Sequence, residues 1–291
     1  MRAAQPAAPA RSITIFSHNR TEDVARPLRR VLELARESGT QVRLPEAEAR
    51  KHGLERQDGL VVGADPAGDT DLALVLGGDG TILSTLRLFA GRGVPVFAIN
   101  FGAIGFLATV EPAELDDGVR RALSGEFDVM ALPALSAGTG EGGELAVNDV
   151  SFHRRHNGRV ADIAYSVERE ELGKVRCDGL VVSTPAGSTG YNLANGGPVL
   201  AWGVEGFVVS FIAPHTLTAR SLVVAPDDTL RVTNRSSAEA LDMTTDGRSC
   251  HPLAPEASIE IRFEHARSLL AQAPGATFYH RLRDKFGRLA Y

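Results

Sequence analysis

The pattern of hydrophobic and polar positions divides the chain into two regions with different periodicities. In the first region, short apolar runs alternate with stretches in which apolar residues recur at helical spacing. The expected strands cover residues 12–17, 41–44, 72–76 and 94–99, and the expected helices cover residues 21–38, 81–89 and 114–124. This alternation predicts an α/β domain, in which helices cover the faces of a parallel sheet.

After about residue 130 the segments become short, rich in β-branched residues and separated by turn residues. The expected strands cover residues 144–152, 159–167, 179–183, 207–212, 221–224, 229–233 and 258–263, and a helix is expected at 278–286. The pattern is typical of an all-β sandwich. We therefore expect a disordered tail at 1–11, an α/β domain at 12–130 and a sandwich-like domain at 131–265. Residues 266–291 are expected to pack back on the α/β domain.

The composition narrows the class of protein. The chain has 291 residues, 43% hydrophobic and 23% charged, with a net charge of −5. These fractions are typical of a globular protein, and the negative charge disfavours a nucleic-acid partner. No apolar run approaches the roughly 20 residues that span a bilayer. Cys177 and Cys250 are too few for a disulfide framework or a thiolate zinc site. We expect a cytoplasmic protein with neither a membrane nor a nucleic-acid partner.

The most informative motif is Gly77-Gly78-Asp79-Gly80, which follows the apolar run 72–76 and precedes an expected helix. Glycine permits positive φ and close approach of the backbone to a ligand, and a helix N-terminus binds phosphate. Asp79 would then face a phosphate, or its metal ion, at the carboxyl end of a strand. The alternative is a tight turn in which Asp79 caps the helix. The usual phosphate-loop, dinucleotide and protein-kinase signatures are absent, so a nucleotide would bind by another design.

A second motif, DGLVVSTPAGSTGY, covers residues 178–191 and is followed by NGGP at 195–198. Its hydroxyl and backbone N–H groups can bind phosphate and ribose, and Tyr191 can stack on a base; the alternative is a polar loop of turn-forming residues. Ser188 lacks the spacing and the partner base of a nucleophilic serine. Taken alone, His215 is better explained as a structural histidine and Asp246 as part of a hairpin turn.

Together and in this order, the motifs resemble those of the NAD kinase family. The matching segments are GGDGTIL (77–83), NFGAIGFL (100–107), Asn148-Asp149, 178–191, NGGP (195–198), PHTLTARS (214–221), Asp246-Gly247 and FYHRLRDKF (278–286). The resemblance runs from about Ser12 to the C-terminus. GGDG alone is shared with diacylglycerol and sphingosine kinases and, more loosely, with phosphofructokinases, whereas segment 178–191 is far more specific.

The resemblance implies an α/β domain followed by a β-sandwich-like domain that binds NAD, with the site between them. It implies phosphorylation of the adenosine ribose 2′-hydroxyl of NAD by ATP or polyphosphate, with a divalent metal (Mg or Mn), in a homodimer or homotetramer whose neighbouring subunit completes the site. Asp79 would orient and deprotonate the hydroxyl. The residues implied for NAD are Asp79, Gly80, Phe106, Asn148, Asp149, Arg176, Asp178, Thr189, Gly190 and Tyr191. Those implied for the phosphates of ATP are Gly77, Gly78, Gly80 and Thr81; no residue is assigned to the metal.

Three positions depart from the family pattern. Asp149 stands where glutamate is usual, Gly190 where alanine is usual, and Ala186 where threonine or serine is common. They motivate the alternative of a catalytically silent NAD(H)- or NADP(H)-binding sensor. The shared GGDG motif leaves a lipid or other small-molecule kinase as a further alternative, which the lack of a basic or amphipathic membrane-binding face disfavours.

Overall fold

The structure is a computed structural model that describes residues 8–138, 143–155 and 158–287. The chain divides into two compact units, one formed by Met1–Ala131 with Ser268–Tyr291 and the other by Leu132–Arg267. We call the first the α/β unit and the second the β unit. The predicted tail at 1–11 falls mostly on residues 1–7, which lie outside the described residues.

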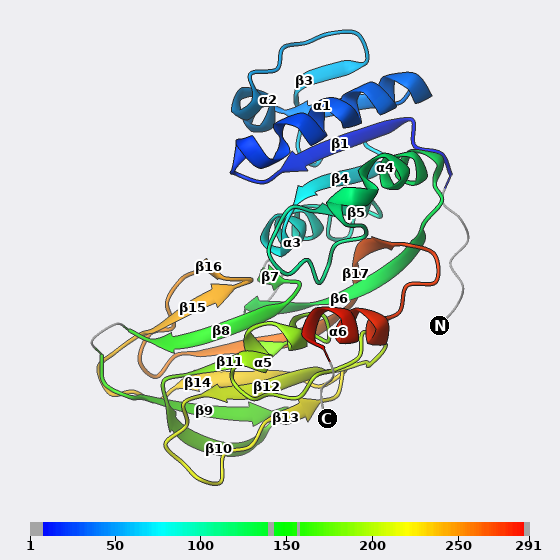
Figure 1. Cartoon of the computed structure of the whole chain (residues 1–291). Coiled ribbons are helices and arrows are strands. Elements are labelled where there is room, and N and C mark those ends of the chain that lie inside the picture. The colour runs from blue at the N-terminus through cyan, green and yellow to red at the C-terminus, as the bar shows by residue number, and fades with distance from the viewer. Residues whose placement is uncertain (1–7, 139–142, 156–157, 288–291) are drawn as a thin grey trace. The chain divides into compact units, whose positions relative to one another are not determined.

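The α/β unit contains a parallel sheet with strand order β17–β5–β4–β1–β2–β3 (Figure 1). All six residues of β4 are buried, which explains why its sequence is continuously apolar. The chain runs outwards from β1 through β2 to β3 and then returns to the other side of β1 with β4 and β5. The strand order therefore reverses between β1 and β4, where open α/β sheets bind ligands beyond the carboxyl ends of their strands. The strands are β1 (Ser12–Ser17), β2 (Gln41–Pro45), β3 (Leu60–Ala64), β4 (Leu72–Gly77), β5 (Pro95–Asn100) and the end of β17 (Ser258–Gln272).

Amphipathic helices cover this sheet. The expected helix at 21–38 is confirmed as α1 (Thr21–Ser38), which buries Val24, Leu28 and Val31 in the same core cluster as the strand residues Ile13 and Leu74. The remaining helices are α2 (Glu46–His52), α3 (Asp79–Leu88), the 3₁₀ turn η1 (Pro112–Glu114), α4 (Leu115–Ser124) and α6 (Phe278–Phe286). Helix α2 was not predicted because its sequence, EAEARKH, buries only Ala49 and so shows no apolar stripe.

The β unit is a sandwich of two antiparallel sheets. One contains β10–β9–β14–β17 with β6 and β7, and the other has the order β13–β12–β11–β8–β15–β16. Phe152 and Phe207 of the second sheet share a core cluster with Ile163 and Val232 of the first, so the two sheets pack face to face. The strands are β6 (Asp128–Gly138), β7 (Glu144–Ala146), β8 (Asp149–Arg154), β9 (Ala161–Val167), β10 (Glu170–Cys177), β11 (Gly179–Ser183), β12 (Phe207–Ile212), β13 (Leu222–Val224), β14 (Leu230–Asn234), β15 (Leu241–Thr245), β16 (Arg248–Ser249) and β17; η2 (Gly187–Thr189) and α5 (Tyr191–Ala194) are the short helices.

The single strand expected at residues 144–152 was wrong, because two strands in different sheets occupy this segment. The break falls at Val147-Asn148, whose backbone N–H groups donate to the Asp246 carboxylate instead of to a strand. A side chain almost 100 residues away therefore ends one strand and starts the next.

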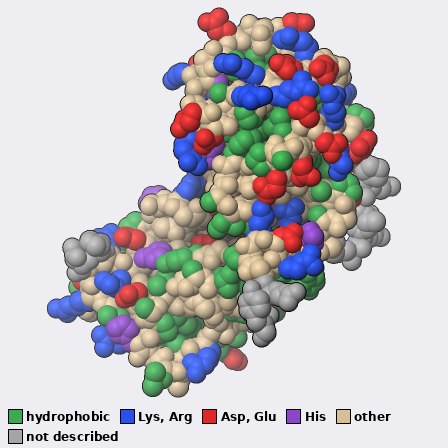
Figure 2. Space-filling model, in the orientation of Figure 1, with side chains coloured by type: hydrophobic (Ala, Val, Ile, Leu, Met, Phe, Trp, Pro, Cys, Tyr) green, Lys and Arg blue, Asp and Glu red, His purple; other side chains and the backbone are tan. Residues whose placement is uncertain are grey.

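The surface of the α/β unit is of mixed charge. On the face that Figure 2 shows, acidic and basic side chains are interspersed over this unit, as the small net charge of −5 suggests. Among the helices that the structure describes, none is both long and apolar enough to cross a membrane.

Candidate functional site

The glycine turn joins β4 to α3, with Gly78 as the N-cap residue of the helix. A Cβ atom on Gly77 would lie 2.8 Å from the side chain of Thr81, and one on Gly78 would lie 2.9 Å from Cα of Gly102, whereas Gly80 faces open space. None of the three has the positive φ that the sequence suggested. Gly77 is therefore required by packing within the turn and Gly78 by the approach of Gly102 from another loop, whereas Gly80 leaves room for a ligand.

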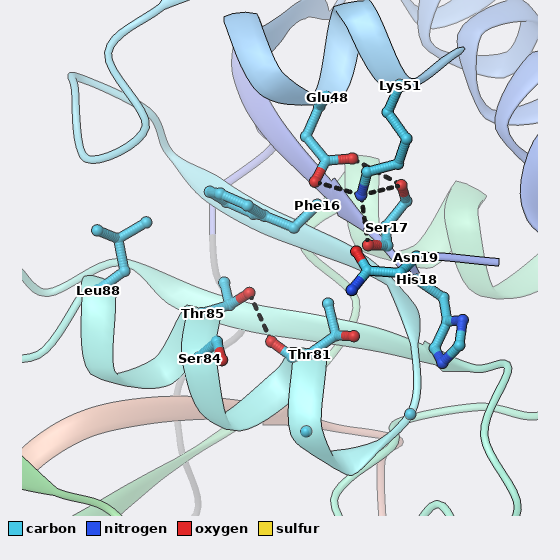
Figure 3. Close-up of a pocket in the computed structure, with 12 residues that line it drawn as sticks. Phe16, Ser17, His18, Asn19, Glu48, Lys51, Thr81, Ser84, Thr85 and Leu88 are labelled. Carbon is cyan, nitrogen blue, oxygen red and sulfur yellow. Dashed lines mark hydrogen bonds and ion pairs between the residues drawn. The ribbon is translucent and has the colours of Figure 1, made fainter. Parts of the chain in front are cut away.

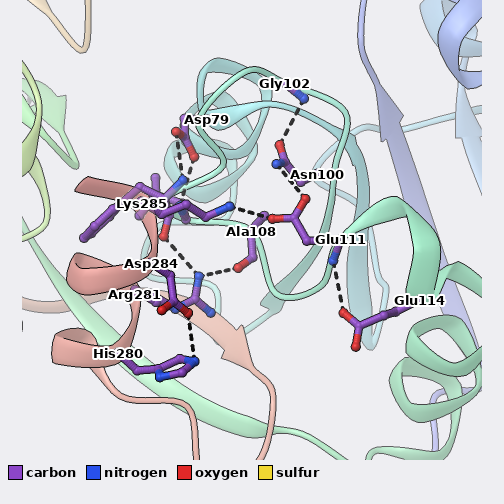
Figure 4. Close-up of polar contacts among 12 residues, drawn as sticks. Asp79, Asn100, Gly102, Ala108, Glu111, Glu114, His280, Arg281, Asp284 and Lys285 are labelled. Atoms are coloured by element: carbon purple, nitrogen blue, oxygen red, sulfur yellow. Dashed lines mark hydrogen bonds and ion pairs between the residues drawn. The ribbon is translucent and has the colours of Figure 1, made fainter. Parts of the chain in front are cut away.

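Asp79 is the first residue of α3, and its carboxylate is held by a neighbouring loop (Figure 4). Oδ2 accepts a hydrogen bond from the backbone N–H of Phe106 at 3.1 Å, and Oδ1 accepts one from Leu107 at 2.9 Å. The alternative interpretation of Asp79 as a helix cap was wrong, because Gly78 occupies the N-cap position and Asp79 is the first residue inside the helix. Phe106 is 5% exposed, and its ring contacts the rings of Phe278 and Phe286 on α6.

A pocket of about 560 Å³ opens where the strand order reverses (Figure 3). The Ser17 hydroxyl at the end of β1 lies 2.6 Å from Oε2 of Glu48 and 2.7 Å from Nε2 of His52. Lys51 donates to the Ser17 carbonyl at 2.9 Å and to Oε1 of Glu48 at 2.8 Å. Burial lowers the pKa of His52, which favours its neutral form. The lining residues are Phe16, Ser17, His18, Asn19, Glu48, Lys51, Gly78, Gly80, Thr81, Ser84, Thr85 and Leu88.

Sequence reasoning found only the glycine turn of this pocket. Ser17, His18 and Asn19 follow the first strand, but nothing local shows that this strand lies beside β4. The signal that could have found them is the rule that ligands bind at the reversal of strand order, which requires the order itself.

In the β unit, Asp246 organises the start of β8. Its carboxylate accepts hydrogen bonds from the backbone N–H groups of Val147 at 3.0 Å, Asn148 at 2.7 Å and Asp149 at 3.2 Å. The predicted hairpin turn is confirmed, since Asp246 and Gly247 both have positive φ between β15 and β16. The sequence did not predict that the Asp246 carboxylate accepts these three backbone hydrogen bonds.

Asp149 is buried with only 7% of its surface exposed. Burial, and secondarily the negative charge of Asp246, raise the pKa of Asp149 from 3.8 to about 7. Asn148, beside it, has a buried Oδ1 atom with no hydrogen-bond partner among the described residues. A buried carbonyl oxygen without a donor is costly in a folded protein, so a ligand N–H or O–H group would satisfy it.

The segment 184–191 packs directly on Asn148. The Thr184 N–H donates to the Asn148 carbonyl at 2.9 Å, and a Cβ atom on Gly187 would lie 2.1 Å from the same oxygen. Ser188 is fully buried and donates to the Pro185 carbonyl at 2.7 Å, as expected for a structural serine. Thr189 and Gly190 follow in the same turn as Gly187 and end it.

Tyr191 has one face packed on His153, with the ring centroids 5.7 Å apart and the rings inclined by 28°. The tyrosine is 38% exposed, so part of its ring remains open to a ligand. Burial lowers the pKa of His153, which favours the neutral imidazole in this stack.

Arg176 and Asp178 do not join this group. Asp178 pairs with Arg154 at 2.6 Å, and Arg176 lies 3.8 Å from Asp162. They precede β11, whereas Asp149 pairs with Ser183 at its other end, roughly 17 Å along the strand. His215 is exposed, and its backbone N–H donates to the Arg176 carbonyl.

Comparisons with known proteins agree on one family. The family model for the ATP-NAD kinase N-terminal domain matches residues 16–127, and the family model for the ATP-NAD kinase C-terminal domain matches residues 147–269. The NAD kinase of Gemmatimonas aurantiaca is 35% identical over 75% of this chain and 77% of its own length.

Two solved structures share the fold. A yeast NADH kinase complexed with NADH has a TM-score of 0.84 at 22% identity, covering 97% of this chain and 89% of that one. An NAD kinase from Archaeoglobus fulgidus in complex with ATP has a TM-score of 0.73 at 24% identity, covering 95% and 97%. The expected pairing of an α/β domain with a second, antiparallel β domain is confirmed. The chain therefore belongs to the NAD kinase family of phosphotransferases.

Proposed function

We propose that this enzyme transfers a phosphoryl group from ATP or polyphosphate to the adenosine ribose 2′-hydroxyl of NAD, giving NADP. The observation that carries the proposal is the turn at Gly78–Gly80, which lines the pocket of about 560 Å³ while the Asp79 carboxylate is held by the separate loop containing Phe106 and Leu107. ATP bound to the Archaeoglobus enzyme and NADH bound to the yeast enzyme support this choice of donor and acceptor.

The donor phosphates are proposed to bind in the pocket beside β1 and β4. Gly80, Thr81 and Ser84 line it at the start of α3, where backbone N–H groups and the helix dipole favour an anion. Its volume lies within the range of about 300–1,000 Å³ that is usual for small-molecule sites. Gly77 and Gly78 are proposed to shape this turn, so that the phosphates approach at Gly80.

Asp79 is proposed to orient the attacking hydroxyl. Each carboxylate oxygen accepts one backbone N–H and retains a lone pair, so the group can accept the hydroxyl hydrogen without losing its support. Phosphoryl transfer depends mostly on positioning and charge neutralisation, so a carboxylate fixed by two hydrogen bonds suits the task.

A divalent metal, Mg or Mn, is proposed to accompany the donor. Among the described residues, no group of three or more His, Cys, Asp or Glu side chains could hold a metal ion. This fits an ion that is bound mainly by the donor phosphates, because Mg²⁺ commonly takes only one or two protein carboxylates. Asp79 would be the carboxylate that holds it, and the bound ion would supply neutralisation of the phosphate charge.

NAD is proposed to contact Asn148, Asp149, Thr189, Gly190 and Tyr191 in the β unit. The unpartnered Oδ1 of Asn148 suits the amino edge of adenine, Asp149 suits ribose hydroxyls, and the open part of the Tyr191 ring suits stacking on a base. Because the ring of Phe106 is buried against α6, we propose that Phe106 acts through its backbone bond to Asp79.

Arg176 and Asp178 are proposed to bind the NAD of a neighbouring subunit in a homodimer or homotetramer, because β11 separates them from Asp149. Light scattering on the purified protein tests the assembly. An active monomer would contradict this assignment, and Asp178→Asn would then leave the KM for NAD unchanged.

The direct test is an activity matrix of donors (ATP, polyphosphate) against acceptors (NAD, NADH, diacylglycerol) with Mg²⁺ or Mn²⁺. Wild type should make NADP, and Asp79→Asn should lower kcat by about 10²–10⁴-fold. Asp69→Asn, an exposed carboxylate in the same unit, is the matched control and should retain activity. Tight dinucleotide binding without turnover under every donor and metal would favour the sensor, and phosphorylation of diacylglycerol alone would favour a lipid kinase.

A further inference from the structure

We propose that Arg281, on the C-terminal helix α6, is a positioning residue that fixes Asp79 through the Phe106–Leu107 peptide. The inference rests on the proposed role of Asp79 in phosphoryl transfer. Arg281 lies in the matching segment FYHRLRDKF (278–286), to which the sequence analysis gave no site role, and it is about 200 residues from Asp79 along the chain.

The connection runs through one peptide plane (Figure 4). The N–H of Leu107 donates to Asp79, and the C=O of Phe106, in the same peptide unit, accepts from Nη1 of Arg281 at 3.0 Å. Nη1 also donates to the Ala108 carbonyl. A trans peptide is planar, so its N–H and C=O point in opposite directions and turn together. Any rotation that frees the Phe106 carbonyl from Arg281 therefore also moves the Leu107 N–H away from Asp79.

Arg281 is itself held in place. Its Nη2 donates to Oε1 of Gln272 at 2.5 Å. Burial lowers the pKa of Arg281 to about 10, while attraction to Asp79 and Glu111 opposes that shift, so the guanidinium is charged at neutral pH. Burying a cation is costly, and this cation donates to the neutral carbonyls of Phe106 and Ala108. We infer that the role of the charged Arg281 guanidinium is to fix the orientation of the Phe106–Leu107 peptide.

Helix α6 also holds the far end of the same loop. Lys285 donates to Oε1 of Glu111 at 2.6 Å, and Oε2 of Glu111 accepts from the Asn100 amide at 3.0 Å. The Asn100 carbonyl oxygen accepts from the Gly102 N–H, and Gly102 is the residue against which Gly78 packs. Helix α6 thus contacts this segment through Arg281 at Phe106 and Ala108 and through Lys285 at Glu111, and Glu111 connects Lys285 to the start of the loop at Asn100.

Arg281→Lys tests the inference, because lysine keeps the charge and loses the planar fork that reaches two carbonyls and Gln272 together. We expect kcat for NADP formation to fall about tenfold or more, since small misplacements of catalytic groups have effects of this size. The KM for ATP should not change, because Arg281 does not line the donor pocket. Arg283→Gln, on the same helix with 65% of its side chain exposed, is the control and should behave as wild type.

Amide exchange measured by NMR separates positioning from a merely structural role. In Arg281→Lys, the Phe106 and Leu107 amides should exchange faster while the amides of β4 and β5 remain as protected as in wild type. In Arg281→Ala, methylguanidinium should restore part of kcat. Loss of protection throughout the α/β unit, without rescue, would indicate a purely structural residue and overturn the proposal.

The outcomes also separate this inference from the proposed function. Normal kcat in Arg281→Lys, with Asp79→Asn inactive, would refute the role of Arg281 alone. Full activity of Asp79→Asn would refute the proposed role of Asp79, and the exchange rates would still report whether Arg281 holds the loop.

Discussion

Replacing Asp149 by asparagine should remove a large pH dependence from the stability of the β unit. In the folded protein Asp149 keeps its proton up to a pKa of about 7, whereas its ordinary value is 3.8. Between these values the folded state binds more protons than the unfolded state, so stability falls as pH rises, by about 1.4 kcal/mol per pH unit. The slope halves at the pKa itself, so wild type loses about 2 kcal/mol from pH 5 to pH 7 and about 3 kcal/mol by pH 8, where the loss levels off. Asparagine stays neutral and should not contribute this slope.

The measurement is urea unfolding of both proteins at several pH values, without ligand. Trp202 is the only tryptophan, is 7% exposed and lies in the β unit, so its fluorescence reports on that unit. The two proteins should have similar stability at pH 5, and the asparagine variant should be more stable by about 3 kcal/mol at pH 8.

The matched control is Asp227→Asn, which changes an exposed carboxylate in the same unit. It should keep the wild-type slope, because every other titrating group is common to both proteins. If the wild-type and Asp149→Asn curves run parallel from pH 5 to pH 8, Asp149 is ionised throughout and the argument from its burial beside Asp246 is wrong.

Three further predictions concern both units. Gly187→Ala should destabilise the protein by about 1–3 kcal/mol and raise the KM for NAD, because its Cβ would overlap the Asn148 carbonyl; Gly203→Ala, which meets nothing within 4 Å, should be nearly neutral in urea unfolding. Tyr191→Ala should weaken NAD binding about tenfold in calorimetry and Tyr191→Phe much less, as loss of an aromatic stack predicts; equal effects would refute stacking. Lys51→Met should destabilise the protein by about 1–3 kcal/mol by leaving Glu48 without its ion partner, and adding Glu48→Gln should recover part of that loss. Additive effects in that double-mutant cycle would show that the pair is not coupled.

The sequence predicts best those helices and strands that bury a regular set of their own side chains, because burial then gives a clear apolar periodicity. Helix α1 and strand β12 agree with their expected bounds, because each buries a regular set of its own residues. Helix α2 has no such stripe, and β17 extends to Gln272, beyond the expected end at residue 263. Its later residues pair with β5, a contact that depends on the chain returning from the β unit.

The glycine turn shows why a motif can be located correctly while its physical reason is not. The sequence places three glycines and one carboxylate between a strand and a helix, and the structure has them there. Gly78, however, is required by the approach of Gly102 from another loop, at a distance that no Cβ would tolerate. Composition alone cannot separate a glycine that admits a ligand from one that admits another segment of the chain.

The same limit explains why the support of Asp79 and the break at Asn148 were both missed. Each depends on backbone N–H groups that donate to a carboxylate far away in sequence. The N–H groups of Phe106 and Leu107 donate to Asp79, and the N–H group of Asn148 donates to Asp246. Backbone donors carry no residue identity, so neither hydropathy pattern nor motif spacing records them. What the sequence does record is the acceptor: an aspartate within two residues of the end of a strand, beside glycine, occurs at both positions. An aspartate in that setting should therefore first be considered as an acceptor that organises a distant loop. A catalytic role for Asp79 requires, in addition, the pocket on the other side of the turn.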